Sequence, residues 1–347
     1  MSAKPIVVLC LITILLNGFA CSRGSKRSGL FQIQQKDKTG YIDKKGQVVI
    51  VPQFDVGHEF SEGLAAVSIG GKYGFVNPKG ELVINPQFDG ADIFSEGMAL
   101  VWIGRKTGFV DQKGTLVINP QFDSAQGFVD DLCAVMVGDK WGYIDKTGKY
   151  VISPQYEDAR PFFDGLAGVK SAGKYGFIDK TGKVIIPFQF NNVGVWFYNL
   201  REGLISWPVA AQTGEKWGFI DRNGKYVINP QYEVACSFQE DLACVRSDGR
   251  FGYIDSTGNF VINPQFDTAS SFSDGRAAAS TSARFGFIDK SGKYVINPQF
   301  ESAGRFIDGL AFVLTRGKDA KEMSGYIDQS GQFVYGPIEI ERVNEGE

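Results

Sequence analysis

The chain has 347 residues with 36 Lys and Arg against 39 Asp and Glu, a net charge of -3 that does not fit a basic nucleic-acid-binding protein. Its 43% hydrophobic residues exclude wholesale disorder, and its single His excludes metal sites built from several His side chains. Its 43 Gly residues, against a usual share of about 7%, indicate many turns.

Residues 1–20 have the features of a leader. Lys4 precedes an apolar run at residues 6–16, which is shorter than the roughly 20 residues of a membrane-spanning helix. Small residues follow this run and lead to Cys21. This arrangement resembles the signal peptide of bacterial lipoproteins, which implies that Cys21 becomes lipidated. Ordinary secretion with an incidental Cys is the alternative.

Residues 21–28 are polar and basic, and we interpret them as a tether between the lipid and the folded part. Ser22 follows the Cys at the position where Asp signals retention in the inner membrane. The lipoprotein resemblance therefore implies anchoring in the outer membrane, on its periplasmic or its surface face.

From residue 29 onward the chain is a tandem repeat. A tetrapeptide of Gly, an aromatic, an aliphatic and Asp or Asn recurs nine times, and most intervals are 34 residues. The starting residues are Gly40, Gly74, Gly108, Gly142, Gly176, Gly218, Gly252, Gly286 and Gly325. A second Gly follows six residues later, and Pro usually follows after twelve, with Gln and an aromatic behind it.

Each unit predicts short antiparallel strands. In residues 141–152, two β-rich runs flank Asp145 and Gly148, a pattern typical of a hairpin turn. Residues 166–170 predict a third strand. The first strand is apolar on both faces, so neighbouring units must cover it. We expect an all-β array of about nine three-stranded repeats of about 34 residues over residues 29–338, and a tail at 339–347.

The repeat resembles the WG-repeat family, also called KWG. The signature is present at Lys140-Trp141-Gly142 and at Lys216-Trp217-Gly218, and Lys72-Tyr73-Gly74 is a conservative variant. The resemblance covers nearly the whole chain after the tether. It implies a bacterial, β-rich protein without enzymatic activity.

The two ends of the array predict how it finishes. Residues 29–33 match the third strand of a unit, and the last unit ends after a hairpin at residues 326–335. These part-units are complementary and together form a ninth unit if the array closes into a propeller-like toroid. An open β-solenoid with incomplete caps explains the same ends.

The repeated polar residues favour structural roles. We expect the aligned Asp and Asn residues to cap turns rather than to bind cations, and the Gln after Pro to satisfy backbone groups of the neighbouring unit. Cys133 and Cys244 replace small residues in strands and are expected as buried thiols, and pairing of Cys236 with Cys244 is left open. We expect no catalytic residue, no bound metal and no cofactor.

The repeat has two longer intervals, of 42 residues between Gly176 and Gly218 and of 39 between Gly286 and Gly325. The second contains a charged insertion at residues 316–323, which we expect to be an exposed loop, whereas the first is rich in aromatic residues. We expect this first insertion to span residues 192–214. Aromatic and Arg side chains anchor interfaces, so these residues are binding candidates, with packing over an irregularity as the alternative. The candidates are Trp196, Phe197, Tyr198, Arg201 and Trp207.

We therefore expect a non-catalytic, lipid-anchored envelope protein that presents a repeat surface to a protein or glycan partner and binds no nucleic acid. The alternative is a structural or assembly component of the bacterial outer membrane. An enzyme is disfavoured, because no acidic or His cluster interrupts the repeat.

Overall fold

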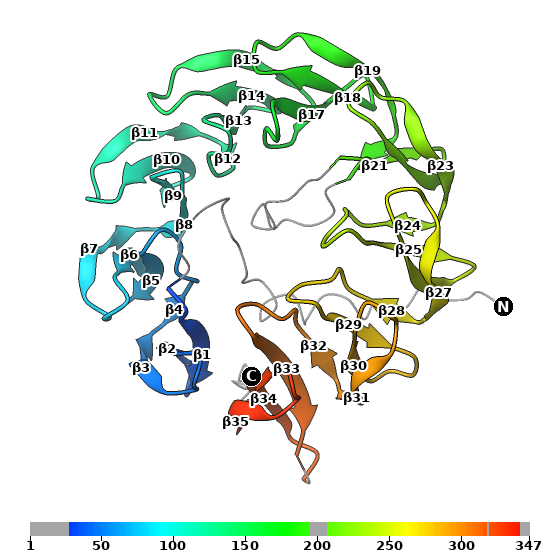
Figure 1. Ribbon diagram of the computed structural model, residues 1–347. Helices are drawn as coiled ribbons and strands as arrows, with labels where there is room; N and C mark the ends of the chain where they lie inside the picture. Colours follow the sequence, from blue (N-terminus) through cyan, green and yellow to red (C-terminus); the bar gives the residue numbers. More distant parts are fainter. Residues whose placement is uncertain (1–27, 195–206, 318, 341–347) are drawn as a thin grey trace, which may run out of the picture.

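The computed structural model describes residues 28–194, 207–317 and 319–340. Within these ranges the chain has no helix, and its 35 strands form nine antiparallel sheets. The sheets stand side by side in a ring (Figure 1). The protein is therefore a nine-bladed β-propeller, and we number its sheets as blades 1 to 9 in chain order.

The strands fall into four positions from the centre of the ring outward. The innermost strands are β4 (Val56–Gly57), β8 (Gly90–Ser95), β12 (Ser124–Ala125), β16 (Asp158–Ala159), β20 (Asn192–Val193), β24 (Val234–Ala235), β28 (Thr268–Ala269) and β32 (Ser302–Ala303). The second strands are β1 (Phe31–Gln35), β5 (Ala65–Ile69), β9 (Met98–Ile103), β13 (Cys133–Val137), β17 (Leu166–Ser171), β21 (Val209–Thr213), β25 (Ala243–Ser247), β29 (Ala277–Ser280) and β33 (Leu310–Arg316).

The third strands carry the repeated Gly motif, and the outer strands carry the Pro. The third strands are β2 (Lys38–Ile42), β6 (Lys72–Val76), β10 (Lys106–Asp111), β14 (Lys140–Ile144), β18 (Lys174–Asp179), β22 (Lys216–Ile220), β26 (Arg250–Ile254), β30 (Phe285–Ile288) and β34 (Glu322–Asp328). The outer strands are β3 (Val48–Phe54), β7 (Leu82–Phe88), β11 (Leu116–Phe122), β15 (Tyr150–Tyr156), β19 (Val184–Phe190), β23 (Tyr226–Tyr232), β27 (Phe260–Phe266), β31 (Tyr294–Phe300) and β35 (Phe333–Glu339).

The expected count of three strands per unit is wrong for eight of the nine described blades. Blade 1 contains β1–β3, and each later blade contains four strands that pair in chain order. The additional strand is the innermost one. Except for β8 it is only two residues long, so it leaves no alternating pattern in the sequence that would predict it.

The repeated Gly lies under a bulge of the outer strand. Between the pairs that flank Gly142, β15 advances four residues while β14 advances two. A Cβ atom on Gly142 would lie 2.5 Å from the carbonyl oxygen of Ile152 and 2.6 Å from the backbone nitrogen of Pro154. The Gly of the motif is therefore required by the close approach of two backbones.

The Asp and Asn residues cap the hairpin turns, as predicted. In blade 4, Oδ1 of Asp145 accepts hydrogen bonds from the amides of Thr147 at 2.9 Å and Lys149 at 3.1 Å. The Thr147 hydroxyl also donates to it at 2.6 Å, and these bonds hold the pKa of Asp145 below its ordinary value. Asn77 accepts the same two backbone bonds, at 3.0 and 3.1 Å, without a charge.

We predict that the fold loses stability in acid through these turns. Hydrogen bonds and nearby charges lower the pKa of seven turn Asp residues: Asp111, Asp145, Asp179, Asp221, Asp255, Asp289 and Asp328. An unfolded Asp titrates near pH ~3.9. Since the folded values are lower, the carboxylates stabilise the fold above about pH 4, and this contribution is lost as the pH falls through the folded values.

The measurement is the urea concentration at which half of the protein is unfolded, determined at pH 6, 4 and 3. A variant with Asn at all seven positions keeps the acceptor oxygen but does not titrate there, as Asn77 shows. Its midpoint is expected to fall less between pH 6 and 3 than that of the wild type. Equal falls in the two proteins would contradict the prediction.

The hydrophobic core lies between adjacent blades rather than within one sheet. Phe75 of blade 2 packs against Phe94 of blade 3, with ring centroids 4.9 Å apart, and both side chains are fully buried. Val76, the next residue in β6, belongs to the cluster shared with blade 1. Each third strand is thus covered on both faces by its neighbours, which explains its apolar sequence.

Packing of blade 1 against blade 9 closes the ring. Phe31 and Ile33 of β1 are buried in one cluster with Leu310 and Tyr326. The Tyr326 hydroxyl donates to the carbonyl oxygen of Gln32 at 2.8 Å. In other blades a Tyr hydroxyl also bonds to the next blade, but to its linker, as from Tyr253 to Ser270 at 2.7 Å. Among the described residues, blade 1 has no innermost strand, so the closing interface uses the carbonyl oxygen of its first strand instead.

The closed toroid is confirmed, but the expected composite ninth unit is wrong. β1 pairs with β2 of its own blade, and β33–β35 form the last sheet without any strand from the N-terminal part. The run that opens the array pairs with the hairpin that follows it. Each blade is thus made from a continuous stretch of chain, and side-chain packing closes the ring.

Candidate binding pocket between blades 5 and 6

Most of the predicted site residues lie outside the described residues. This holds for the lipidation candidate Cys21 and for the binding candidates Trp196, Phe197, Tyr198 and Arg201. Trp207 is described. The expected insertion at 192–214 is too wide, because it contains β20 and β21 of blade 6. The additional residues lie between Gly194 and Trp207.

Trp207 occupies a position that is Phe in the other blades. In blades 3 and 4, Phe109 packs against Phe128 with ring centroids 5.0 Å apart. In blades 5 and 6, Phe177 packs in the same way against Trp207 at 5.8 Å. Twelve residues lie between Gly194 and Trp207. In blade 4 a single residue, Gly127, lies between the equivalent positions Gln126 and Phe128. Trp207 is therefore both a packing residue and the end of the break.

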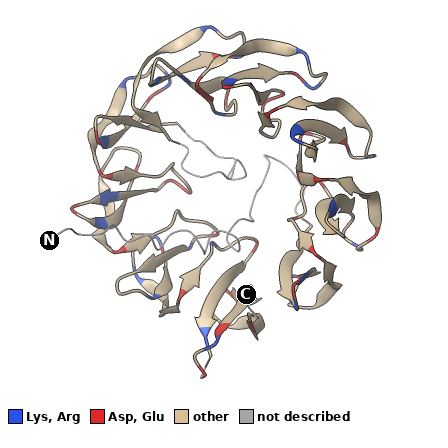
Figure 2. Cartoon of the chain, turned by 180° about the vertical axis from the view of Figure 1, so that it is seen from behind, with Lys and Arg blue, Asp and Glu red and all other residues tan. Residues whose placement is uncertain are grey.

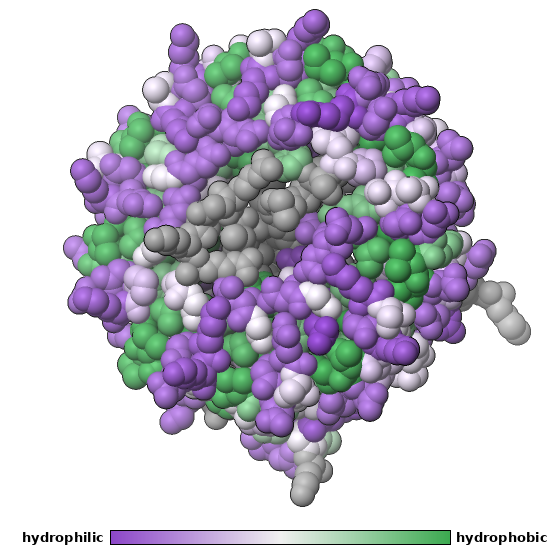
Figure 3. Space-filling model, viewed as in Figure 1, coloured by the Kyte–Doolittle hydropathy of each residue, from purple (hydrophilic) through white to green (hydrophobic). Residues whose placement is uncertain are grey.

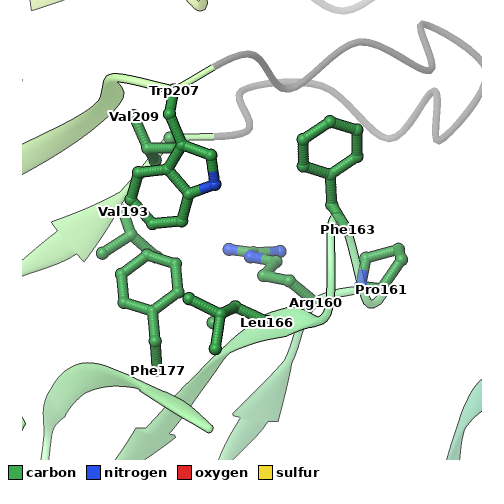
Figure 4. Close-up of a pocket in the computed structure, with 10 residues that line it drawn as sticks. Arg160, Pro161, Phe163, Leu166, Phe177, Val193, Trp207 and Val209 are labelled. Atoms are coloured by element: carbon green, nitrogen blue, oxygen red, sulfur yellow. The ribbon is translucent and has the colours of Figure 1, made fainter. Parts of the chain in front are cut away.

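A pocket lies at this break, between blades 5 and 6 (Figure 4). It contains about 320 Å³ of empty space, part of it open to solvent. Its walls are largely aromatic and aliphatic. The lining residues are Arg160, Pro161, Phe163, Leu166, Gly168, Phe177, Val193, Gly194, Trp207 and Val209. None of these side chains carries a hydrogen-bond acceptor oxygen.

Two buried N–H groups in this pocket have no hydrogen-bond partner among the described residues, Nε1 of Trp207 and Nε of Arg160. Figure 4 shows the indole nitrogen turned toward the interior of the pocket, above the guanidinium. A buried donor without a partner is costly, because water no longer solvates it. The pocket thus combines apolar walls with two unmet donors.

A carboxylate balances the charge of Arg160. Its Nη2 lies 3.2 Å from Oδ2 of Asp158 and 3.1 Å from the hydroxyl of Tyr175, which itself donates to Asp158. Burial and this bond to Asp158 raise the pKa of Tyr175 to about 12. The hydroxyl is therefore neutral at physiological pH, and Asp158 is the counter-charge of the guanidinium.

The sequence analysis missed Arg160 and Gly168 as site residues. Arg160 stands where other linkers carry His58, Asp92 or Gln126, and Gly168 stands where blades 4 and 6 have Ala. A Cβ on Gly168 would lie 3.0 Å from Cγ2 of Val193, inside the pocket. Departures from the repeat outside the long interval are the signal that would have found both residues.

The predicted role of the repeated Gln is wrong. Gln87 and Gln155 donate to carbonyl oxygens two residues earlier in their own outer strands, at 3.4 and 3.3 Å, and both bonds are exposed. The outer strand is the open edge of each blade, so this side chain faces solvent instead of the next blade.

Cys133, Cys236 and Cys244 form no disulfide in the described part of the chain. Cys133 and Cys244 are buried, as predicted, whereas Cys236 is only partly buried. Burial raises the pKa of Cys133 well above its ordinary value. The described residues contain no group of three or more His, Cys, Asp or Glu side chains placed to hold a metal ion.

The rest of the ring surface is mixed. Acidic and basic residues alternate around it (Figure 2), and apolar side chains form separate patches between hydrophilic ones (Figure 3). One run of exposed apolar residues follows the ends of the second strands in blades 2 to 4. It contains Ile69, Trp102, Ile103 and Val137. No described segment forms a helix with the length and hydrophobicity needed to cross a membrane.

Comparisons with solved structures agree with the fold. A crystal structure of the eukaryotic initiation factor is similar, with a TM-score of 0.62 at 12% identity over 88% of this chain and 94% of that chain. Hsv2 of Kluyveromyces lactis reaches a TM-score of 0.39 at 12% identity over 77% and 94%. The likeness to the initiation factor, at 12% identity, supports the fold alone. No curated protein matches the chain.

A family model matches most of the chain. Eight segments match the model of the WG containing repeat, at residues 40–73, 73–106, 108–141, 141–175, 175–205, 217–250, 251–281 and 285–318. These matches cover the Gly motif in the third strands of blades 1 to 8, where the outer strand approaches too closely for a side chain. The chain therefore belongs to the family of proteins built from WG-containing repeats.

Proposed function

We propose that this protein is a non-catalytic binding or scaffold module of a bacterial envelope, anchored by a lipid on Cys21 and engaging a protein or glycan partner. The ring of WG repeats fits such a role, because packed blades give a rigid and broad surface. The observation that carries the proposal is the break between blades 5 and 6, where the repeat leaves a pocket with two unmet donors instead of closed packing.

The leader supports the anchoring part of the proposal. Residues 6–16 are too short to span a bilayer as a helix, and Cys21 follows small residues. We predict that replacing Cys21 with Ala abolishes incorporation of a fatty-acid analogue and moves the protein from the membrane fraction to the soluble fraction. Membrane retention without incorporation of the analogue would contradict lipid anchoring.

The break itself can be tested by restoring the repeat. The variant replaces residues 195–208 with a copy of the six residues Gly127–Leu132 of blade 4, which shortens the interval between Gly176 and Gly218 from 42 to the standard 34 residues. We predict that crosslinking in intact cells captures the partner of the wild type and loses most of it in the variant, while the melting temperature is retained. The control is Trp102→Ser, in the apolar run of blades 2 to 4. Equal capture by wild type and repeat-restored variant would exclude the break as the binding site.

A further inference from the structure

The pocket between blades 5 and 6 specifies the chemistry of its ligand. The indole N–H of Trp207 and the Nε–H of Arg160 are both buried and unpaired among the described residues. The lining side chains that belong to the described residues supply no acceptor of their own. A ligand that fits must therefore bring an acceptor oxygen to these two donors.

The charges around the pocket favour a neutral acceptor. Asp158, 3.2 Å from the guanidinium of Arg160, already balances its charge, and an anionic ligand would be repelled by this carboxylate. A second cation, Arg222, lies 6.0 Å from the ring centroid of Trp207 but is paired with Asp164 at 2.9 Å. A cationic ligand would face the Arg160 guanidinium, and no described lining side chain offers it an acceptor oxygen. The acceptor that fits is a carbonyl oxygen.

The apolar walls of the pocket indicate which chemical group of the ligand lies beside the carbonyl oxygen. Phe163, Phe177 and Trp207 provide aromatic surfaces, with Leu166 and Val209 between them (Figure 4). A sugar needs acceptors for its hydroxyl groups, and these walls offer none. An aromatic or branched aliphatic side chain buries its surface against them and gains the transfer free energy of apolar burial.

We infer that this pocket binds a protein partner through an aromatic or branched aliphatic residue, whose backbone carbonyl oxygen accepts hydrogen bonds from Trp207 and Arg160. The inference rests on the proposed binding role of the same break and narrows its partner to a protein. Gly168 makes the room, because a side chain there would project against Val193 and into the pocket.

The test uses the full chain in detergent micelles with fluorine-labelled Trp. The protein has 5 Trp residues, so five fluorine signals are expected, and Trp207→Phe identifies one of them. The probes are N-acetyl-phenylalaninamide, which carries the inferred chemistry, phenethylamine as a cation without an acceptor, and glucose as a sugar without an amide carbonyl. We expect the amide to shift the Trp207 signal and to leave that of Trp102 unchanged.

Gly168→Ala is the variant that fills the pocket. Because Ala is the residue of blades 4 and 6 at this position, the fold is expected to tolerate it. The amide should bind this variant roughly fivefold or more weakly, the size of one lost hydrogen bond or a few lost contacts. The control is Gly127→Ala, whose Cβ has only an ordinary contact at 3.6 Å and should leave binding unchanged.

The outcomes separate the inference from the proposed function. No shift of the Trp207 signal with the amide, equal binding of phenethylamine or of the sugar, or full binding by Gly168→Ala would each overturn the inference. If the amide binds as expected while the repeat-restored variant still captures the partner, the proposed function is wrong and the pocket chemistry stands. If capture depends on the break and the amide does not bind, only the inference fails.

Discussion

Replacing Gly142 with Ala is expected to destabilise the propeller by about 3 kcal/mol or more, because the new Cβ overlaps backbone atoms that cannot move aside alone. It would meet the carbonyl oxygen of Ile152 at 2.5 Å and the nitrogen of Pro154 at 2.6 Å. Both atoms belong to the bulge of β15, so relief requires the outer strand to separate from β14. The measurement is the free energy of unfolding in urea.

The control for this variant is another Gly→Ala replacement in the same blade. Gly127 lies in the linker of blade 4, and a Cβ there has its nearest contact at 3.6 Å. Its replacement is expected to change stability by no more than about 0.5 kcal/mol. Gly252→Ala, where the carbonyl oxygen of Ile262 would be 2.6 Å away, should repeat the large effect. If Gly142→Ala and Gly252→Ala lower the free energy of unfolding only slightly, the outer strand does not lie close enough to exclude a side chain at these positions.

Deleting residues 29–35 is expected to open the ring. The deletion removes β1, and with it Phe31 and Ile33, which are 3% and 4% exposed in the interface with blade 9. Loss of two such side chains costs about 3–6 kcal/mol. It also leaves the Tyr326 hydroxyl without the carbonyl oxygen of Gln32. We expect a lower melting temperature and a larger maximum dimension in small-angle X-ray scattering.

A pair of hydroxyl deletions tests closure without removing a strand. Tyr326→Phe removes the bond from blade 9 to blade 1, and Tyr253→Phe removes a bond between Tyr and the next blade at the interface of blades 7 and 8. Each is expected to cost about 0.5–1.5 kcal/mol, since a part-buried hydrogen bond is lost. Equal losses support a closed ring in solution. A neutral Tyr326→Phe beside a destabilising Tyr253→Phe would show that the ring is open there.

The local parts of each blade were predictable from the sequence. Asp145 and Gly148 marked the hairpin turn, because the cap bonds lie within four residues of the Asp. The aromatic residues of the linkers also recur at the repeat interval, as Phe94 and Phe128 do. The innermost strands were not, because a pair such as Asp158–Ala159 becomes a strand only when its neighbour is in place.

Of the residues that line the pocket, the sequence predicted only Trp207 as a binding candidate. The long interval drew attention to Trp207, whereas Arg160, on the other blade, is not among the predicted binding candidates. The two side chains are 47 positions apart, and only packing of blade 6 on blade 5 brings them to one pocket. Sequence spacing carries no information about such a pair when the chain between them turns through two sheets.

The sequence by itself determined the repeat, its hairpins and its turn caps, because these depend on contacts within one unit. It also showed that the third strands are apolar on both faces and need neighbouring units to cover them, but it left the choice between a ring and a solenoid open. Only the tertiary structure decided that nine continuous blades close on themselves and that the break leaves a pocket. The physical reason is that closure depends on the angle at which successive sheets pack, and many side chains on two units set that angle together.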